Sequence, residues 1–238
     1  MATPNDNASA HPAHRYDAEV RKVIPFYDTI QSETLDLVRS VAGEPARWVD
    51  TGAGTAALVE RAVAAFPHTR FVLADPSEAM LAQTRLRLSK VSPGRVTVLP
   101  AMGSAGLSRV EPPLRAEVVT AILCHHYSNP PERQVAVQAC YDILTPGGLL
   151  VVFENVDCDT PHGRKLGLAR WRQFQLQQGR TPDEVDKHLA RFGTELKPVR
   201  IAEHLELLRT VGFATAEIFW RAHLQAGFYA IKSGCLSS

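Results

Sequence analysis

Short apolar runs alternate with segments of helical period along most of the chain. The runs at 46–50, 71–74, 96–99, 118–124 and 149–154 predict five strands. The run at 118–124 is continuous, which is typical of a strand that is buried on both faces of a parallel sheet. Regular alternation of this kind predicts an α/β fold in which right-handed crossovers join parallel strands.

Capping residues mark several of the predicted helices. Asn129, Pro130 and Glu132 provide a cap residue, a proline at the first helical position and an acid in the first turn, and they predict a helix that runs to Leu144. The sequence 145–148 (Thr-Pro-Gly-Gly) should end it. The sequence 181–184 (Thr-Pro-Asp-Glu) predicts a capping box.

The two ends of the chain depart from strict alternation. Residues 16–41 have helical spacing that Pro25 interrupts, so we predict a kinked entry helix. The runs 217–224 and 227–232 are joined by a turn too short for a crossover helix, and they should pair antiparallel. Most of the intervening segment, about 155–200, looks helical, and we predict that it is a lid insertion.

Composition and charge narrow the class of protein. The chain has 238 residues, 45% of them hydrophobic and 21% charged, which suits a single α/β domain over 15–238 preceded by a disordered N-terminus at 1–14. The net charge of +1 excludes a global field that would hold the protein on nucleic acid or on a membrane. Segment 1–14 lacks the apolar core of a signal or a span, and the four scattered cysteines favour a reduced, cytoplasmic setting without a zinc motif.

The main chemical signal is the turn from Asp50 to Gly54. A strand runs through Asp50 into Gly52-Ala53-Gly54 and then into a helix, so the backbone can approach a ligand closely. Asp75 follows Gly54 by 21 residues at the end of the next strand, where a carboxylate can accept hydrogen bonds from both ribose hydroxyls. Together they indicate an adenosyl-binding site.

Nicotinamide-binding folds share this pair of features, and Gly52-x-Gly54-x-x-Ala57 satisfies their loosened fingerprint. Three features favour another cofactor. Asp50 stands two residues before the first glycine, where an acid can meet an ammonium group. The segment 75–80 (Asp-Pro-Ser-Glu-Ala-Met) and the segment 144–148 (Leu-Thr-Pro-Gly-Gly) are the other two.

With these motifs and the closing hairpin, the chain resembles class I S-adenosylmethionine-dependent methyltransferases over about 16–232. The resemblance implies a doubly wound seven-stranded, mostly parallel sheet of order 3-2-1-4-5-7-6, with strand 7 antiparallel, and S-adenosyl-L-methionine as the cofactor. Within that superfamily, the segments 23–27 (Val-Ile-Pro-Phe-Tyr) and 219–223 (Phe-Trp-Arg-Ala-His) are similar to the branch that contains carboxy-S-adenosylmethionine synthase and related small methyltransferases.

The same resemblance assigns roles to individual residues. Tyr27 would hydrogen-bond the cofactor, Asp50 would lie near its ammonium group, and Asp75 would hold its ribose. The remaining assigned contacts are Gly52, Ala53 and Gly54 for the amino-acid portion, Pro76 and Met80 beside the adenine, Met102 and Gly103 at its edge, and Ala121 beneath the methionine moiety.

The sequence departs from the family pattern at two positions. Many members have Asp where this chain has Met102, so recognition of the adenine amino group would depend on the backbone or on Ser104. The synthase of carboxylated cofactor uses an Arg where this chain has Leu207. We therefore do not predict carboxylated cofactor synthesis.

The sequence 124–127 (Cys-His-His-Tyr) follows the fourth strand, which in this fold faces the transferring methyl group. A histidine here could act as general base, and we name His126 as the candidate catalytic residue. Adjacent strand residues point to opposite faces, so at most one of His125 and His126 enters the pocket. A purely structural role for both remains an alternative, and we predict no metal site.

These observations favour methyl transfer to a small-molecule acceptor. Residues 160–200 hold nine Lys or Arg against four Asp or Glu, a surplus of five that could receive an anionic substrate or RNA, although a solvated helical face also explains it. An RNA-modifying methyltransferase is therefore an alternative. A non-catalytic S-adenosylmethionine-binding protein is another. Trp171, Phe174 and Phe192 of the insertion could form an apolar wall of the acceptor pocket, or they could simply be core.

Overall fold

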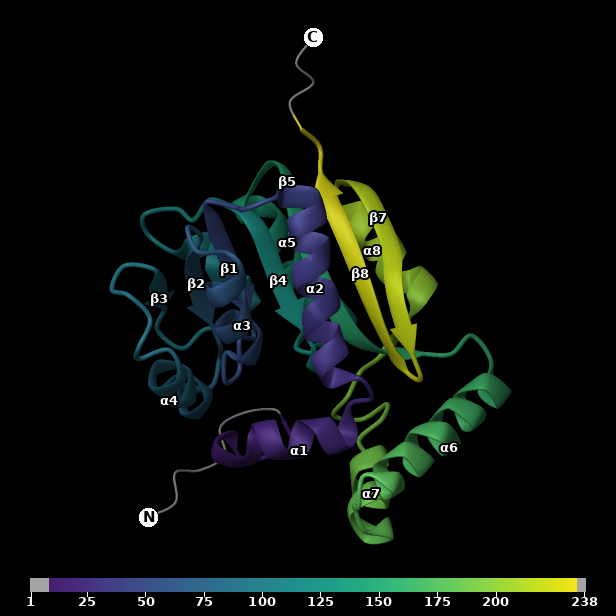
Figure 1. Cartoon of the computed structure of the whole chain (residues 1–238). Helices are drawn as coiled ribbons and strands as arrows, with labels where there is room; N and C mark the ends of the chain where they lie inside the picture. Colours follow the sequence, from purple (N-terminus) through teal and green to yellow (C-terminus); the bar gives the residue numbers. More distant parts are fainter. Residues whose placement is uncertain (1–8, 235–238) are drawn as a thin grey trace.

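An eight-stranded sheet organises residues 9–234, the part of the chain that the computed structural model describes (Figure 1). Its main path runs β3-β2-β1-β4-β5-β8-β7, and the two-residue strand β6 pairs with β5 off this path. The strands are β1 Arg47–Thr51, β2 Arg70–Ala74, β3 Val96–Val98, β4 Ala116–Ile122, β5 Leu144–Asp157, β6 Val199–Arg200, β7 Phe213–Ala222 and β8 Gln225–Lys232.

The predicted strand order and pairing are confirmed. β1 to β5 are parallel neighbours, and β8 pairs antiparallel with both β5 and β7. The short strand β6 only raises the numbers of the last two strands by one. The order 3-2-1-4-5-7-6 of the sequence analysis is therefore the observed order 3-2-1-4-5-8-7.

Helices cover both faces of the sheet. The helices are α1 Tyr16–Val23, α2 Tyr27–Ala42, α3 Ala57–Ala65, α4 Glu78–Arg87, α5 Pro130–Ile143, α6 Pro161–Gln177, α7 Pro182–Leu189 and α8 Ile201–Val211, with short 3-10 helices η1 Ala13–Arg15, η2 Ser104–Arg109 and η3 His125–Tyr127. In Figure 1, α2 and α3 lie on the near face, and α5 and α8 lie behind the sheet.

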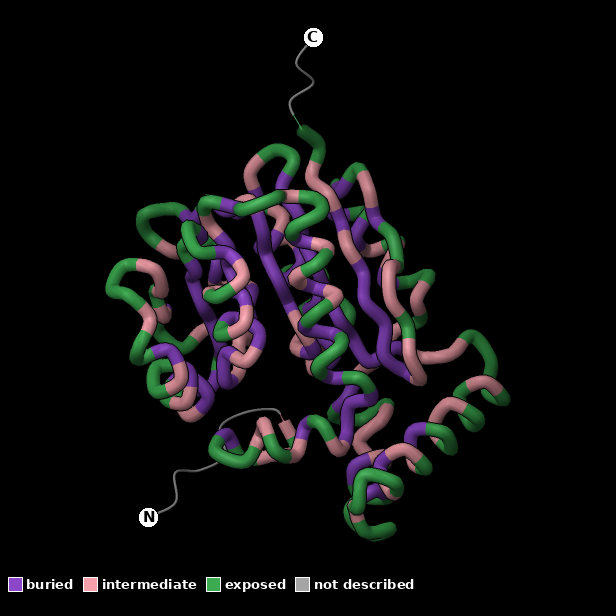
Figure 2. The backbone as a smooth tube through the Cα atoms, viewed as in Figure 1, coloured by how far each residue is buried: buried purple, intermediate pink, exposed green. Residues whose placement is uncertain are grey.

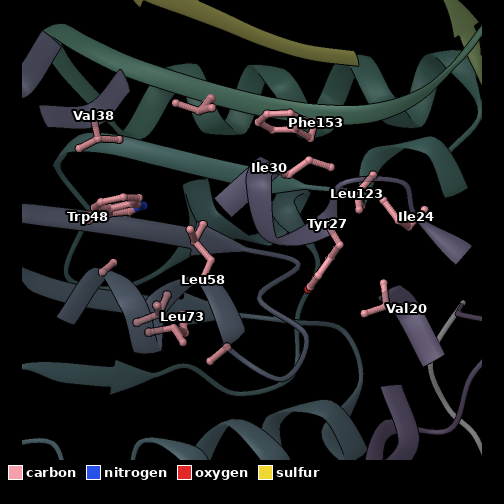
Figure 3. Packing of buried hydrophobic residues seen from close by; sticks show 14 of the residues in the cluster. Val20, Ile24, Tyr27, Ile30, Val38, Trp48, Leu58, Leu73, Leu123 and Phe153 are labelled. Atoms are coloured by element: carbon pink, nitrogen blue, oxygen red, sulfur yellow. The ribbon is translucent and has the colours of Figure 1, made fainter. Parts of the chain in front are cut away.

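Two buried clusters correspond to the two faces. Trp48 of β1 packs with α2 and α3, whereas its neighbour Val49 belongs to the cluster that includes α5 and α8. Figure 3 shows Ile30 and Val38 of α2, together with Trp48, in the first cluster. The strands between the helical layers are largely buried along their length (Figure 2). The alternating strand geometry thus divides consecutive residues between two cores.

Two strand boundaries differ from the predictions. β4 ends at Ile122, two residues before the predicted end, because Leu123 adopts a positive φ of 57° that takes the chain out of the sheet. β5 starts at Leu144, within the predicted stop, and continues to Asp157. Its longer course is supported by antiparallel pairing with β8 from Leu149 to Asn155.

The entry segment forms two helices rather than one kinked helix. α1 ends at Val23, and Phe26, with φ of 58°, precedes α2. Much of the predicted disordered segment 1–14, namely 1–8, lies outside the described residues. Residues 9–14 are described, and within them Ala13 is buried in η1.

The predicted insertion contains α6 and α7, which lie beside α1 beyond one end of the sheet (Figure 1). The Nε1–H of Trp171 in α6 donates to the Val23 carbonyl at 2.6 Å, which ties α6 to α1. The capping box of Thr181 and Glu184 opens α7, as predicted. Across residues 9–234, no helix combines the length and apolarity needed to cross a membrane.

Candidate active site

The turn after β1 requires its two glycines for different reasons. Gly52 has φ of +65°, and a Cβ there would lie 2.4 Å from the Cβ of Cys124. Gly54 has φ of +57°, but a Cβ would meet nothing within 4 Å. A side chain at position 52 is therefore disfavoured both by the backbone conformation and by contact with Cys124. At position 54 only the backbone conformation disfavours a side chain, because the space around it is open.

The Asp75 carboxylate at the end of β2 holds this turn in place. Its Oδ2 accepts from the Gly54 N–H at 2.9 Å, and its Oδ1 accepts from the Ser77 N–H at 2.9 Å. The Thr84 hydroxyl of α4 donates to the Gly54 carbonyl at 2.8 Å. Each carboxylate oxygen can accept a further hydrogen bond, so Asp75 can hold the turn and still accept from hydroxyl groups of a ligand.

A hollow of about 340 Å³, the strand-end hollow, opens at the carboxyl ends of β1, β2 and β4. Crevices at this edge of a parallel sheet are where ligands bind in open α/β folds. Six of the predicted cofactor-contact residues line it, namely Gly52, Gly54, Asp75, Pro76, Met80 and Gly103.

Three further predicted residues line a smaller space of about 40 Å³ behind the turn, the turn pocket, namely Tyr27, Asp50 and Ala53. Burial raises the pKa of Asp50 to about 7, a hydrogen bond from Thr120 opposes that rise, and the Asp75 charge adds to it. The Nε2 of Gln31, which also lines this pocket, is buried without a hydrogen-bond partner among residues 9–234. The pocket therefore holds an acid that a bound cation would ionise.

Two predicted contacts lie outside both spaces. Ala121 is fully buried in the cluster on the opposite face of β4, and its neighbour Ile122 lines the strand-end hollow instead. The two residues differ in this way because successive side chains on a strand point to opposite faces. Met102 packs against Gly106 rather than lining the hollow, whereas Ser104, named as its substitute, does line it.

The two histidines lie in η3 and not on the strand, so strand alternation does not apply to them. His125 lines the strand-end hollow, and its Nε2 is 2.7 Å from the Ser104 hydroxyl. His126, the predicted catalytic residue, lines a neighbouring space of about 30 Å³ that we call the inner chamber. The structure thus assigns the two side chains to different spaces.

Glu154 of β5 orients His126. Its Oε2 lies 2.9 Å from His126 Nδ1, and its Oε1 accepts from the His125 backbone N–H at 3.2 Å. Burial raises the pKa of Glu154. The hydrogen bond and charge of His126, together with the charges of His125 and Arg133, lower it by more than burial raises it, so this pKa lies below its ordinary value. An ionised Glu154 accepts a hydrogen bond from the Nδ1–H of His126, which leaves Nε2 as the basic nitrogen.

The sequence analysis missed Glu154, which it treated only as the end of a strand. The one available signal was a carboxylate at the carboxyl end of a strand adjacent to the one that precedes the histidines. Asn155 belongs to the same group, since its side-chain nitrogen lies 3.3 Å from His126 Nε2.

The inner chamber connects the strand-end hollow to a third space. Tyr16, Leu123 and Tyr127 line both the chamber and the strand-end hollow. His188 and Arg191 line both the chamber and an outer hollow of about 340 Å³ between α1 and α7. Three adjoining spaces, separated by shared side chains, therefore lie in a row from the glycine turn to α7.

The predicted apolar wall of the insertion lies elsewhere. Trp171 is fully buried, with its ring centroid 5.2 Å from that of His188 and 6.4 Å from that of Phe192. Phe174 packs partly buried against the same core. These aromatics hold α6 and α7 together, and the insertion reaches the row of spaces through His188, Arg191 and Leu196. Within residues 9–234, no three His, Cys, Asp or Glu side chains are grouped to hold a metal ion.

Comparison with protein families matches residues 49–150, which run from within β1 through the glycine turn and strands β2 to β4 into β5, to a methyltransferase domain. Similar curated proteins include carboxy-S-adenosyl-L-methionine synthase of Trichodesmium erythraeum, 23% identical over 92% of this chain and 85% of that protein. The enzyme of the same name from Trichlorobacter lovleyi is 24% identical over 98% of this chain and all of that protein.

Solved structures share the fold. An O-methyltransferase family protein of Burkholderia thailandensis has a TM-score of 0.65 and 15% identity over 92% of this chain, although the chain spans only 58% of that protein. Magnesium protoporphyrin IX methyltransferase of Synechocystis, solved with S-adenosylhomocysteine, has a TM-score of 0.61 and 14% identity over 93% of this chain and 96% of that one.

Proposed function

Since the chain belongs to the class I S-adenosylmethionine-dependent methyltransferase superfamily and has S-adenosyl-L-methionine as its cofactor, we propose that it methylates a small molecule whose nucleophilic atom enters the inner chamber. One observation carries the proposal. The strand-end hollow, with Asp75, meets the inner chamber, with the His126–Glu154 pair, at the shared residues Tyr16, Leu123 and Tyr127.

The residues of the strand-end hollow and turn pocket suit this cofactor. Gly54 and Gly103 line the hollow without a side chain, and a Cβ at either would stand in open space. Asp75 offers carboxylate oxygens to ribose hydroxyls, and Asp50 offers a carboxyl to an ammonium group. When bound, the cofactor supplies a methyl group on a sulfonium sulfur, which a nucleophile displaces in line.

His126 would act on the acceptor rather than on the cofactor. When the acceptor replaces the 3.3 Å hydrogen bond from the Asn155 amide, Nε2 takes the proton that the acceptor's nucleophilic atom loses as the new bond to carbon forms, and Glu154 stabilises the resulting imidazolium. Burial of both side chains keeps water away from the pair. The enclosing residues also hold the acceptor in one orientation, which contributes to rate by proximity.

We do not propose synthesis of the carboxylated cofactor, the activity in the name of the curated relatives. Leu207 of α8 stands where that enzyme uses an arginine, and it packs partly buried against the cluster behind the sheet. No cation of α8 lines the strand-end hollow within the described residues. The chain therefore lacks a positive group at the position that the resemblance requires.

An RNA acceptor is less favoured by the placement of the basic residues. Of the nine cations counted at 160–200, Arg180, Lys187 and Arg191 line the outer hollow. Arg164 and Arg172 instead form ion pairs with acids away from it. The basic surplus is divided between surfaces rather than gathered into one track along which RNA could lie.

Calorimetry with S-adenosylhomocysteine and with NAD tests the proposal. We expect S-adenosylhomocysteine to bind and NAD to give no heat, because the carboxyl of Asp50 can pair with the ammonium group of S-adenosylhomocysteine. Release of S-adenosylhomocysteine during a screen of small phenols, amines and thiols then identifies the acceptor. Binding of NAD without the homologue would refute the proposal.

A further inference from the structure

The outer hollow concentrates positive charge beyond the inner chamber. Its lining includes the cations Arg15, Arg180, Lys187 and Arg191 against the two acids Glu19 and Glu184. Three of these cations have an acidic partner: Arg15 pairs with Glu19, Lys187 with Asp183 and Arg191 with Glu195. Glu184 closes the capping box of α7 through the backbone and hydroxyl of Thr181.

Arg180 is the cation whose charge is least compensated. Its guanidinium donates to the side-chain oxygen of Gln175 and to the Glu184 carbonyl, which are both neutral. Within residues 9–234 no carboxylate lies within ion-pair distance of it. A partly buried guanidinium that donates only to neutral oxygens binds an anion more readily than one already paired with an acid.

His188 links this charge to the inner chamber. It is 7% exposed, it lines both spaces, and its Nδ1 has no hydrogen-bond partner in the part of the chain described here. Burial, followed by the charges of Arg180, Arg191, His11 and His126, lowers the pKa of His188 to about 3. His188 is therefore neutral, and the cations around it would favour an anion bound beside it.

We propose that the methyl acceptor carries an anionic group, a carboxylate or a phosphate, which binds in the outer hollow at Arg180, Arg191 and His188 while its nucleophilic atom faces His126. The order of the spaces fixes this orientation, because the inner chamber lies between Arg180 in the outer hollow and the strand-end hollow. The inference rests on the proposed function, since it assigns the acceptor's nucleophilic atom to the inner chamber.

The planar guanidinium of an arginine binds a carboxylate or phosphate through two parallel hydrogen bonds, which a neutral amide cannot accept in the same way. An acceptor acid would thus be selected by charge at one end and positioned for deprotonation at the other. A neutral molecule of the same shape would give the Arg180 guanidinium no charged partner, so Arg180 would keep only its hydrogen bonds to neutral oxygens.

Calorimetric titration of the protein saturated with S-adenosylhomocysteine tests this inference with benzoate, phenyl phosphate and benzamide as probes. We expect at least one of the two anions to bind at least about tenfold more tightly than benzamide, as for a hydrogen bond to a charged group. The anion that binds with the higher affinity shows whether the acidic group of the acceptor is a carboxylate or a phosphate. Arg180→Gln should weaken anion binding about tenfold, whereas Arg172→Gln, which removes an ion pair to Asp186 outside the hollow, should leave it unchanged.

The affinity for S-adenosylhomocysteine, measured on each variant, separates the possible failures. Absence of homologue binding in the unmodified protein would refute the proposed function. If S-adenosylhomocysteine binds normally, three results would refute this inference alone. They are equal affinity for benzamide and both anions, no heat from either anion at millimolar concentration, and unchanged anion affinity in Arg180→Gln.

Discussion

The strand-end hollow and the inner chamber meet, but they are built in different ways. The hollow is shaped by backbone: glycines at positive φ, a carboxylate that accepts backbone N–H groups and the ends of parallel strands. The chamber is shaped by side chains from distant parts of the chain, with Glu154 against His126 and His188 beside Arg191. A site shaped by backbone suits one fixed ligand. A site shaped by side chains can come to bind a different ligand through few substitutions.

The largest effect should come from the chamber. His126→Gln should lower kcat by about 10²- to 10⁴-fold, because it removes the proton acceptor. The affinity for S-adenosylhomocysteine should stay the same, since His126 lies outside the strand-end hollow. Glu154→Gln should lower kcat by a smaller factor, because an amide still accepts from Nδ1 without stabilising the imidazolium. Steady-state kinetics with the identified acceptor measures both, and an unchanged kcat in His126→Gln would assign that residue to structure.

The next effect concerns the backbone of the hollow. Gly52→Ala should lower the free energy of unfolding by about 3 kcal/mol, because strain at positive φ adds to a clash with Cys124. Gly54→Ala, with similar φ and open space, should cost only about 1 kcal/mol. Urea unfolding without ligand measures both.

The double variant Gly52→Ala, Cys124→Gly separates clash from strain. Removal of the Cys124 side chain should recover part of the loss, because the 2.4 Å contact disappears while the positive φ remains. Equal stability of the two single glycine variants would show that the turn adjusts and that close contact is not its constraint.

Loss of the Asp75 carboxylate should be smaller in free energy but specific to the cofactor. Asp75→Ala should weaken S-adenosylhomocysteine binding by about 10²-fold, because two hydrogen bonds to a charged acceptor are lost and the turn loses its anchor to Gly54. Asp75→Asn, which keeps one acceptor oxygen, should weaken it less. Calorimetry of the three proteins gives the comparison, and affinity retained in the alanine variant would place the ribose elsewhere.

The smallest effect is a pH dependence of the turn pocket. A cation bound beside Asp50 favours its ionised form, so S-adenosylhomocysteine affinity should fall about tenfold from pH 8 to pH 6, through the Asp50 pKa of about 7. Asp50→Asn should abolish this dependence. A wild-type affinity that is constant across this range would remove Asp50 from the ammonium site.

The same carboxyl should influence stability without ligand. The pKa of Asp50 is higher in the folded protein than in the unfolded chain, so the folded state binds more protons between about pH 4 and pH 7. The stability that protonated Asp50 contributes is therefore lost as the pH rises through that window. Relative to the wild type, Asp50→Asn should therefore be more stable at pH 8 than at pH 5. Thermal unfolding at the two values measures the difference.

The sequence predicted the hollow better than the chamber because the hollow depends on local motifs. The turn 50–54 and Asp75 lie 21 residues apart within one βαβ unit, and their geometry follows from that unit. Ala121 shows how sensitive a strand position is to register, since Ile122, one residue on, lines the strand-end hollow. The sequence marked residues 160–200 as basic, but the outer hollow could not be located because it joins residues near position 15 to residues near position 190.

The histidines show the same limit at short range. Strand alternation was applied to His125 and His126, but the positive φ of Leu123 ends the strand first. Nothing in the sequence marks that conformation, because Leu rarely adopts it. Glu154 was overlooked for a related reason, since its pairing with His126 depends on the register of β4 against β5.

Helix α1 couples the two halves of the site. Asp17 accepts from the Thr55 hydroxyl at 2.7 Å and pairs with Arg87, so α1 is fastened to the residue after the glycine turn and to α4. The adjacent Tyr16 lines the strand-end hollow, the turn pocket and the inner chamber alike. One aromatic side chain therefore forms part of the wall of all three spaces, so a substitution at Tyr16 would alter the donor and acceptor sites together.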